Sequence, residues 1–469
     1  MLNYNTQKYM KPNILFFVID SFRSDKCVGP RKNSITPNID YLISNGVYFK
    51  NAISSSNSSS PAWLSWFTGL YPFNIKNNES YQRITESNHN YVKILKENGY
   101  HVYSTMPRQA EYLGFTKEFE NKDASFPIHS RLSKGLGDSI LEKIKGKNMQ
   151  EPWFYFVHVL DLHSPIHPPK EFDTDEFGGN PYERTISSID SWIGKIMKLI
   201  DFEKTLVIIT ADHGSFVPSV TQESNLGINR NKIDVKLWQL EDKIPKSIRS
   251  IVRNSARKIE KRRQKTRQLK VKNLDLKPFE KRNLMYSDLF TMFNPSPENN
   301  FLYDDIVKVP LIITGNKIKS HKVIDNQIRN SIDIFPTIFE MVGIKINHRI
   351  DGESLIPIME GKDVKEKIVF SEGFTSAKNN KRNVIGVRTS KYKYFRIRNE
   401  LLENAHLYDL ELDPLEENNL IKTKTTIAKE MEEKLIQIEN SSQNIIEFED
   451  ISTDEAKDIE NELKKLGYI

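Results

Sequence analysis

The stretch that decides the fold is "PNILFFVID", residues 12–20, in which six consecutive apolar residues lead to an aspartate. The run has the length of a buried strand and is far shorter than the roughly 18 to 20 residues of a membrane helix. Three further runs repeat the pattern: "WFYFVHVL" at 153–160, "TLVIITADHG" at 205–214 and "DDIVKVPLIITG" at 304–315. Because these strands have no polar face and helical patterns lie between them, they predict a mostly parallel sheet covered by helices on both sides.

Other segments divide the chain into two parts. Residues 36–52 predict a helix with a Thr-Pro start and then a short strand. Short alternating strands at 383–397 and 406–420 follow, and the chain from Lys424 onward is acidic and helical. We therefore expect an α/β fold with a large mixed, mostly parallel sheet between helices, and a smaller C-terminal antiparallel sheet with terminal helices. The expected bounds of these parts are 1–350 and 351–469.

Composition indicates a globular protein. Of the 469 residues, 38% are hydrophobic and 28% are charged, which is ordinary for folded domains. The apolar run near the start is not followed by a small-residue cleavage site, so we expect a cytoplasmic chain with no transmembrane partner. The single cysteine, Cys27, excludes an intramolecular disulfide and a thiolate metal cluster.

The positive charge is concentrated in one segment. Residues 243–272 hold 13 Lys or Arg and one acid, Glu260, and their isoleucines recur at helical spacing. We expect a basic amphipathic helix within an insertion at 216–298. It could lie on the body as a lid over the site, or it could contact a polyanion such as an acidic polymer, a nucleic acid or a membrane surface. No other feature suggests a stable nucleic-acid partner.

Polar residues follow the predicted strands. Asp20, the pair Asp212 and His213, and the pair Asp161 and His163 all come at the carboxyl ends of apolar runs. In parallel sheets these ends meet at one edge, where sites form. A single aspartate there usually caps a turn or a helix. Carboxylate and imidazole ligands together are typical of a Zn, Mn, Mg or Ca site.

Residues 54–72, "SSSNSSSPAWLSWFTGLYP", begin like a flexible linker. The serine run ends at Pro61 and an apolar segment follows immediately, which a solvated linker would not show. The pattern predicts a buried helix whose first residues are serines. The amino terminus of a helix stabilises negative charge on a nucleophile or on a bound anion.

These segments, in this order, resemble blocks of the sulfatase family within the alkaline phosphatase superfamily, and the resemblance covers nearly the whole chain. The blocks include "NILFFVIDSFRSD", "SSPAWLSWFTGLYP", "HVLDLHSPIHPP", "TADHG", "LYDDIVKVPLII" and "LYDLELDPLEENNL". In the family the nucleophile is a Cys or Ser followed by x-Pro-x-Arg, with Thr-Gly starting five residues after that Arg. Counting back from Thr68 places Ser59 at the nucleophile, Pro61 at the proline and Trp63 at the arginine.

The resemblance implies roles for these residues. The implied catalytic residues are Ser59 and His163, the metal ligands Asp20, Ser59, Asp212 and His213, and the substrate contacts Asp161, His167 and Trp63. It also implies one divalent ion (Zn, Mn or Ca) and a maturation enzyme that converts Ser59 to formylglycine. The substrate would be a small anionic ester or an anionic polysaccharide. Asp161, His163 and His167 could alternatively form a second metal site, whereas His158 is expected to be a buried, hydrogen-bonded histidine.

The chain departs from the family pattern at several positions. Ser21 stands where the family often has a second Asp, and Trp63 where it has Arg. His213 replaces a common Asn, and Asn299 and Asn300 occupy the region of a Lys. Losing a carboxylate and gaining an imidazole shifts metal preference from calcium towards softer ions.

Three functions stay open at this stage. A formylglycine hydrate releases sulfate by collapsing to an aldehyde, so a modified Ser59 favours a sulfatase. An unmodified Ser59 favours a phosphodiesterase, phosphonate hydrolase or phosphoryl transferase, because water can open a serine phosphate. The third alternative is a non-catalytic protein that binds polyanions through 243–272.

Overall fold

The computed structural model describes most of the chain outside one long internal segment. The described residues are 11–72, 82–84, 90–127, 130–146, 149–163, 166–215, 302–316, 318, 321–373, 384–398, 405–441 and 448–450. The chain forms two units, Met1–Ser215 with Asn300–Ile469 and Phe216–Asn299, and every described residue belongs to the first. The basic segment 243–272, the insertion 216–298, Asn299 and Asn300 lie outside the described residues. Predictions about them, and the boundary at residue 350, stay predictions.

An eight-stranded mixed sheet forms the centre of the described part, in the order β5-β4-β6-β1-β7-β8-β2-β9. β8 runs antiparallel to both of its neighbours, and the other pairs are parallel. The strands are β1 (Asn13–Ile19), β2 (Gly46–Ile53), β4 (His101–Pro107), β5 (Ser125–Phe126), β6 (Trp153–Val159), β7 (Thr205–Thr210), β8 (Lys308–Gly315) and β9 (Lys322–Arg329). The mixed, mostly parallel sheet predicted from the sequence is confirmed.

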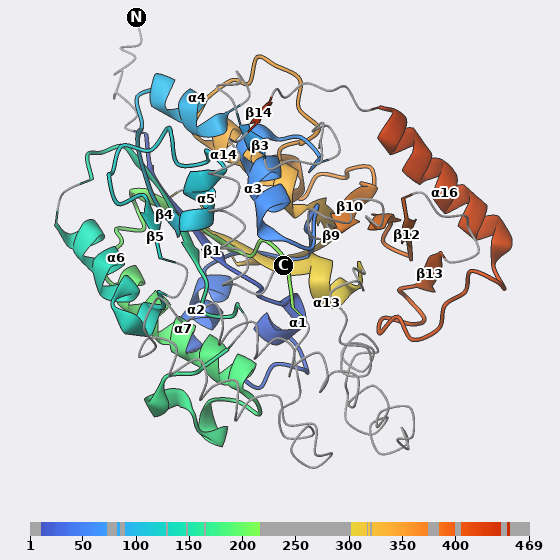
Figure 1. Cartoon of the computed structure of the whole chain (residues 1–469), viewed down its shortest axis with the longest axis horizontal. Helices are drawn as coiled ribbons and strands as arrows, with labels where there is room; N and C mark the ends of the chain where they lie inside the picture. The colour runs from blue at the N-terminus through green and yellow to red at the C-terminus, as the bar shows by residue number, and fades with distance from the viewer. Residues whose placement is uncertain are drawn as a thin grey trace, which may run out of the picture. The chain divides into compact units, whose positions relative to one another are not determined.

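Helices cover both faces of this sheet, as Figure 1 shows. One face carries α2 (Pro37–Ser44), α6 (Leu136–Lys145) and α7 (Pro181–Met197). The other carries α3 (Ser59–Thr68), α4 (Tyr91–Glu97) and α14 (Asn330–Met341). Short helices are α1 (Ser24–Cys27), α5 (Arg108–Tyr112), α13 (Asp304–Val307) and α15 (Ile356–Met359). Every residue of β1, β6 and β7 is buried, as expected for strands covered on both faces.

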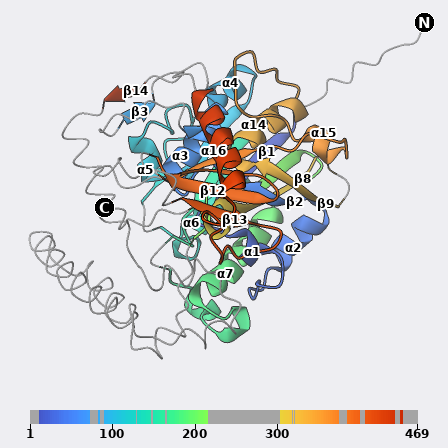
Figure 2. The ribbon, with the colours of Figure 1, turned by 90° about the vertical axis from the view of Figure 1, so that its right-hand side faces the viewer.

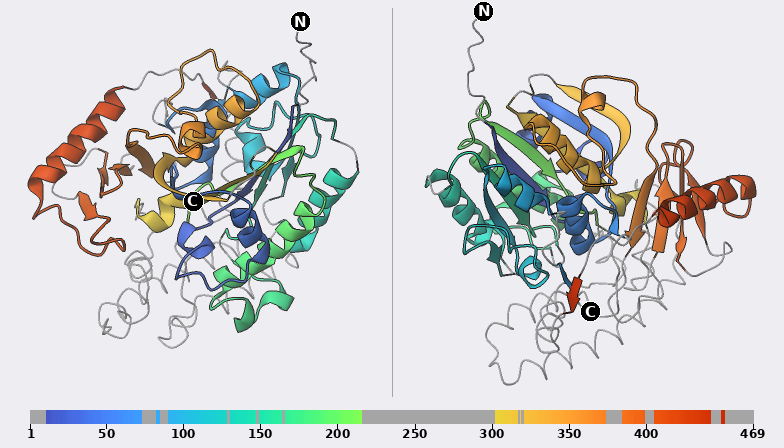
Figure 3. Two further views of the ribbon diagram at one scale, coloured as in Figure 1. Left: turned by 180° about the vertical axis from the view of Figure 1, so that it is seen from behind. Right: turned by 90° about the horizontal axis from the view of Figure 1, so that it is seen from above.

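Aromatic packing fixes α3 against the sheet. Phe16 of β1 stacks on Phe156 of β6 and on Phe335 of α14, with ring centroids 5.1 and 5.6 Å apart. Trp66 of α3 meets Phe16 edge-on at 5.5 Å. Both views in Figure 3 show α3 and α14 side by side, and the two helices are in contact. These large rings hold the start of α3 at the carboxyl edge of the strands.

The C-terminal strands form a separate antiparallel sheet, β10-β11-β12-β13, as predicted. Its elements are β10 (Val369–Gly373), β11 (Val384–Arg388), β12 (Tyr392–Ile397) and β13 (His406–Asp409). α16 (Thr425–Asn440) lies across it in Figure 2 and buries Met431 and Leu435 against Phe370 and Leu407. A small pairing of β3 (Gln82–Ile84) with β14 (Phe448–Asp450) completes the strands of the described part.

The serine run is bound to this second sheet. Ser56 forms a parallel bridge with Glu372, and Glu372 N donates to Ser55 O at 2.9 Å. Ser371 Oγ donates to Ser54 O at 2.6 Å. Residues 54–56 are buried. The serine run that leads into α3 is therefore held in place by backbone and side-chain hydrogen bonds and is not a flexible linker.

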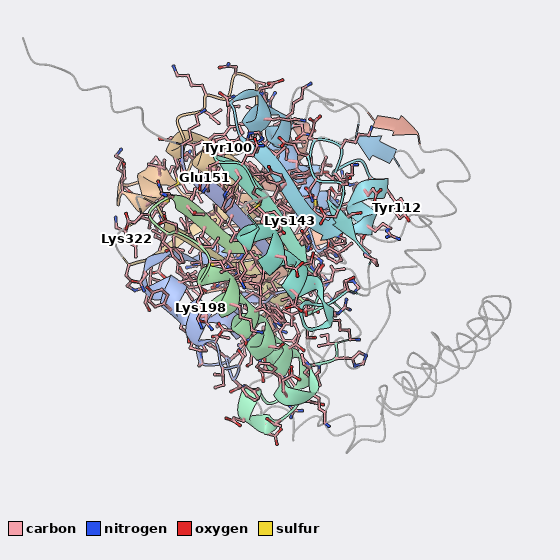
Figure 4. The ribbon with its side chains drawn as sticks, turned by 90° about the vertical axis from the view of Figure 1, so that its left-hand side faces the viewer. Tyr100, Tyr112, Lys143, Glu151, Lys198 and Lys322 are labelled. Carbon is pink, nitrogen blue, oxygen red and sulfur yellow. The ribbon has the colours of Figure 1, made fainter. Side chains whose placement is uncertain are left out.

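Hydrogen bonds close the amino-terminal edge of the large sheet, where Figure 4 labels Tyr100 and Glu151. Tyr100 Oη donates to Pro12 O at 3.0 Å, and Asn13 Nδ2 donates to Glu151 Oε1 at 2.9 Å. At the carboxyl edge, by contrast, several buried polar atoms have no hydrogen-bond partner among the described residues. Within the described ranges, no helix is both long and apolar enough to cross a membrane.

Candidate active site

Two buried carboxylates meet at the carboxyl edge of adjacent strands. Asp20 follows β1 directly, and Asp212 follows β7 by two residues; both are fully buried. Their strands pair in parallel, so the side chains lie at one edge. Ser21 N donates to Asp212 Oδ1 at 3.1 Å, which links the two loops. The structure thus brings together the two aspartates that the sequence placed at strand ends.

Ser59 joins them from the other side of the edge. It is the first residue of α3, is 4% exposed, and its Oγ donates to Asp20 Oδ2 at 3.2 Å. Ser58, the N-cap residue, makes no side-chain capping hydrogen bond. Ser21, held at a left-handed φ of 60°, donates its hydroxyl to Asp20 Oδ1. Ser59 therefore combines a carboxylate partner with a helix amino terminus that has no side-chain cap.

His213 is buried beside Asp212. Its backbone N–H donates to Asp212 Oδ1 at 2.8 Å, and its ring Nδ1 lies 2.7 Å from Gly214 O. A carbonyl oxygen only accepts, so Nδ1 carries the hydrogen and Nε2 keeps a free lone pair. Nε2 lies 3.5 Å from Asp212 Oδ2, and neither atom has a hydrogen-bond partner among the described residues.

The electrostatics of this edge favour the ionised form of Asp20. Burial raises the pKa of Asp20, but the adjacent imidazole of His158 and the charges of His163 and His213 outweigh it and hold that pKa well below its usual range. Burial lowers the pKa of His213, but the charges of Asp212 and Asp20 and the hydrogen bond to Gly214 raise it above the ordinary value. The carboxylate of Asp20 and the imidazole of His213 therefore each favour the charged form of the other.

His158 also lies at this edge, a position not predicted from the sequence. It belongs to β6 and is fully buried, and its Nε2 lies 3.6 Å from Asp20 Oδ2 and 3.5 Å from Asp212 Oδ2. Its Nδ1 accepts a hydrogen bond from Trp63 Nε1 at 2.7 Å. The expectation of a buried, hydrogen-bonded histidine is confirmed. Strand parity was the available signal, because His158 shares a face with Phe156, which packs on α3.

The donor set fits a divalent cation. One oxygen each of Asp20 and Asp212 and one nitrogen of His158 lie within 4.8 Å of one another, close enough to surround an ion. His213 is outside this group, but its free Nε2 lies next to the unpartnered Asp212 Oδ2. Two buried carboxylates need a compensating positive charge, and metal coordination provides one.

The remaining predicted residues are less closely grouped. Asp161, after β6, accepts hydrogen bonds from Leu132 N at 3.1 and 3.3 Å. Burial raises its pKa to about 6 against the opposing charge of Arg131, a residue that sequence reasoning missed and that also acts on Asp20. Burial and nearby lysine and arginine charges lower the pKa of His167. In the described part of the chain, Asp161, His163 and His167 do not form a three-ligand group, so a second metal gains no support.

Trp63 lies behind the site. It is fully buried, and its ring meets His158 edge-on with centroids 5.3 Å apart. Its single N–H donates a hydrogen bond to His158. This position gives no support to the substrate contact expected for Trp63.

Comparison with known proteins identifies the family. A sequence model described as "Sulfatase" matches residues 12–344, and one described as "N-sulphoglucosamine sulphohydrolase, C-terminal" matches residues 297–441. An ulvan-active sulfatase from Formosa agariphila is 22% identical over 93% of this chain and 80% of its own length. A match to an uncharacterized protein from Haemophilus influenzae, 26% identical over 48% of this chain, spans only 36% of that protein.

Solved structures agree on the fold. A 2-O GAG sulfatase aligns with a TM-score of 0.61 at 18% identity and covers 92% of each chain. The phosphonate monoester hydrolase of Agrobacterium radiobacter aligns with a TM-score of 0.60 at 17% identity, covering 92% of this chain and 96% of its own. The fold is therefore that of the alkaline phosphatase superfamily. Within it, the chain belongs to the sulfatase family, and its class is that of the sulfuric ester hydrolases.

Proposed function

We propose that this chain hydrolyses sulfate esters of an anionic saccharide, with residue 59 as the nucleophile. The observation that carries the proposal is the position of Ser59 at the first residue of α3, 3.2 Å from the buried carboxylate of Asp20. The register of the family motif, counted from Thr68, assigns the same residue. Two independent observations therefore agree on the reacting group.

The chain's own groups suit this reaction. Asp20 stays ionised at neutral pH, so it can accept the hydrogen of a hydroxyl at residue 59. The first-turn amides of α3 favour an anion at this position. His163 lies near enough to Asp20 for its charge to act on that carboxylate, and we assign it the protonation of the leaving oxygen.

Asp20, Asp212 and His213, with residue 59, are the ligands we propose for one divalent ion. When bound, such an ion supplies positive charge for the sulfate group and acidifies the nucleophile hydroxyl. The imidazole of His213 favours Zn or Mn over Ca. Its Nδ1 hydrogen bond to Gly214 O orients the ring as metal-ligating histidines usually are.

The substrate class follows from the relatives. An ulvan-active sulfatase and a 2-O GAG sulfatase are both named for sulfated polymers, so we propose a sulfated anionic polysaccharide. Contact of segment 243–272 with that polymer is part of the proposal, since its charges would complement the substrate.

Mass analysis of residue 59 tests the nucleophile. The chain is produced together with a serine-type maturation enzyme, and the peptide containing Ser59 is measured beside aryl sulfate turnover. We expect loss of two hydrogens at Ser59, turnover in proportion to the modified fraction, and no turnover by Ser59→Ala. Ser60→Ala, one position along α3, is the matched control. Turnover of the sulfate by a chain with unmodified Ser59 would contradict the formylglycine route.

A second candidate, phosphodiester or phosphonate hydrolysis by unmodified Ser59, is favoured by one observation. Trp63 stands at the arginine of the maturation signal, and its N–H is committed to His158. A chain that escapes maturation would keep a serine, whose phosphate water can open. Comparing sulfate with phosphorus esters separates the two candidates.

A further inference from the structure

The pair formed by Trp63 and His158 fixes the hydrogen positions of a buried imidazole. Trp63 Nε1 lies 2.7 Å from His158 Nδ1, and both side chains are fully buried. An indole nitrogen donates and does not accept, so Nδ1 must be the acceptor. The ring hydrogen of His158 therefore belongs to Nε2.

This tautomer decides what His158 offers to the site. Nε2 faces Asp20 Oδ2 at 3.6 Å and Asp212 Oδ2 at 3.5 Å, slightly beyond hydrogen-bond distance, and makes no hydrogen bond within the described residues. A nitrogen that carries a hydrogen has no lone pair in the ring plane for a metal ion. His158 lies within the three-residue group around the candidate ion, yet it presents an N–H group to the two carboxylates.

His213 has the opposite arrangement. Its Nδ1 lies 2.7 Å from the carbonyl of Gly214, which can only accept, so Nε2 keeps its lone pair. This is the usual arrangement of a metal-ligating histidine, whose other nitrogen donates to an oxygen. The two imidazoles beside Asp212 thus differ in chemistry although each lies 3.5 Å from the same oxygen, Oδ2.

We propose that His158 is a positioning residue and not a metal ligand: its Nε2–H orients the carboxylates of Asp20 and Asp212, and Trp63 fixes its tautomer. The proposal rests on the metal site of the proposed function. Trp63, which stands where the family has an arginine, supplies the N–H that Nδ1 accepts. Trp63 of α3 and His158 of β6 thus connect the nucleophile helix to the carboxylates at the sheet edge.

The first test uses the unaltered chain. Long-range proton–nitrogen correlation spectra of histidine-labelled protein report which imidazole nitrogen carries hydrogen, and His158→Gln identifies the His158 signals. We expect Nε2 to be protonated both without metal and with Zn²⁺ added. A hydrogen on Nδ1, or loss of the Nε2 hydrogen when Zn²⁺ binds, would overturn the proposal.

The second test measures Co²⁺ affinity and its visible absorption. Glutamine keeps an N–H donor but no imidazole, so His158→Gln should bind Co²⁺ within about 3-fold of the original chain with an unchanged spectrum. His158→Leu lacks the donor and should bind about 10- to 100-fold more weakly. A changed spectrum and a loss beyond about 10-fold in His158→Gln would mean that His158 is a ligand.

Tryptophan variants test whether Trp63 fixes the tautomer of His158. Trp63→Phe removes the donor, so Nδ1 can take the hydrogen and free Nε2 for the metal; we expect an altered Co²⁺ spectrum. Trp66→Phe is the matched control, since Trp66 is equally buried on α3 and donates to Asn330 O. An unchanged spectrum in Trp63→Phe would count against the proposal. The tautomer is measured without turnover, so failure of the sulfatase reaction leaves these results interpretable.

Discussion

At the residue scale, the chemistry of the site depends on which atoms of its buried polar groups already form hydrogen bonds. Asp20 uses both oxygens on serine hydroxyls, whereas Asp212 keeps Oδ2 without a hydrogen-bond partner among the described residues. Residue types at strand ends indicated that Asp20 and Asp212 would meet. The hydrogen bonds that fix the tautomers of His158 and His213 could not be predicted. His158 accepts from Trp63, 95 residues away in the chain, and His213 donates to a backbone carbonyl.

Replacing His213 tests the metal preference. His213→Asn exchanges a borderline nitrogen ligand for an amide oxygen, so Zn²⁺ should bind at least about 10-fold more weakly while Ca²⁺ binding changes less. Titration of both ions into chelator-treated protein measures the effect. His101→Asn is the control, because His101 makes a surface ion pair with Glu120. Equal Zn²⁺ affinity in His213→Asn and the original chain would remove His213 from the ligand set.

Asp161 should make the free energy of unfolding depend on pH. Its pKa is raised from 3.8 to about 6 by burial, so the folded state holds a proton that the unfolded state has released between these values. Stability must therefore fall as pH rises from about 4 to about 6, by roughly 3 kcal/mol from this group. Asp161→Asn removes this dependence and still accepts from Leu132 N. Urea unfolding of both proteins across this range measures the difference, and parallel pH profiles would contradict the assignment.

At the element scale, apolar runs predicted the strands that carry the site. β1, β6 and β7 lie where expected because burial on both faces leaves an unbroken apolar sequence. β9 was not predicted: it lies at the sheet edge, and the buried residues of "KVIDNQIR" do not alternate with exposed ones, so the sequence has no clear period. The antiparallel direction of β8 also depends on pairing with β7 and β2 and not on its own residues.

The end of α3 provides a stability test. Gly69 has φ of +68°, and a Cβ there would lie 2.1 Å from Tyr91 Oη. Gly99 has φ of +82° with open space around it. We expect Gly99→Ala to lose about 1–2 kcal/mol from backbone strain, and Gly69→Ala to lose about 3 kcal/mol or more because the clash adds to it. Denaturant unfolding compares the two, and equal losses would show that α3 tolerates the displacement.

At the scale of the whole described part, the C-terminal sheet supports the catalytic edge. β10 binds the serine run that leads into Ser59, and α13, which contacts β8, carries Asp304 into a buried ionic cluster with β11 and β12. Burial raises the pKa of Asp304, but Arg388, Lys393 and Lys308 hold it well below its usual range. The sequence predicted the second sheet but not this cluster, whose members lie 84 and 89 residues apart.

Breaking this cluster should destabilise the protein. Arg388 donates twice to Asp304, at 3.0 and 2.9 Å, and is 6% exposed. Arg388→Leu leaves a buried carboxylate with less compensation, so we expect a loss of about 3 kcal/mol or more. Arg184→Leu, which breaks ion pairs to exposed Asp173 and Asp175, should cost no more than about 1 kcal/mol. Equal losses in thermal or urea unfolding would exclude a structural role for the cluster.

The central claim is that the site of Asp20, Ser59 and Asp212 hydrolyses a sulfate ester. The most direct measurement is turnover of an aryl sulfate, an aryl phosphodiester and an aryl phosphonate with one leaving group, on a single matured and metal-titrated sample. We predict that the sulfate has the highest kcat/KM, that its turnover saturates at one divalent ion per chain, and that Ser59→Ala abolishes it. Faster turnover of either phosphorus ester, with sulfate turnover at background, would contradict the account.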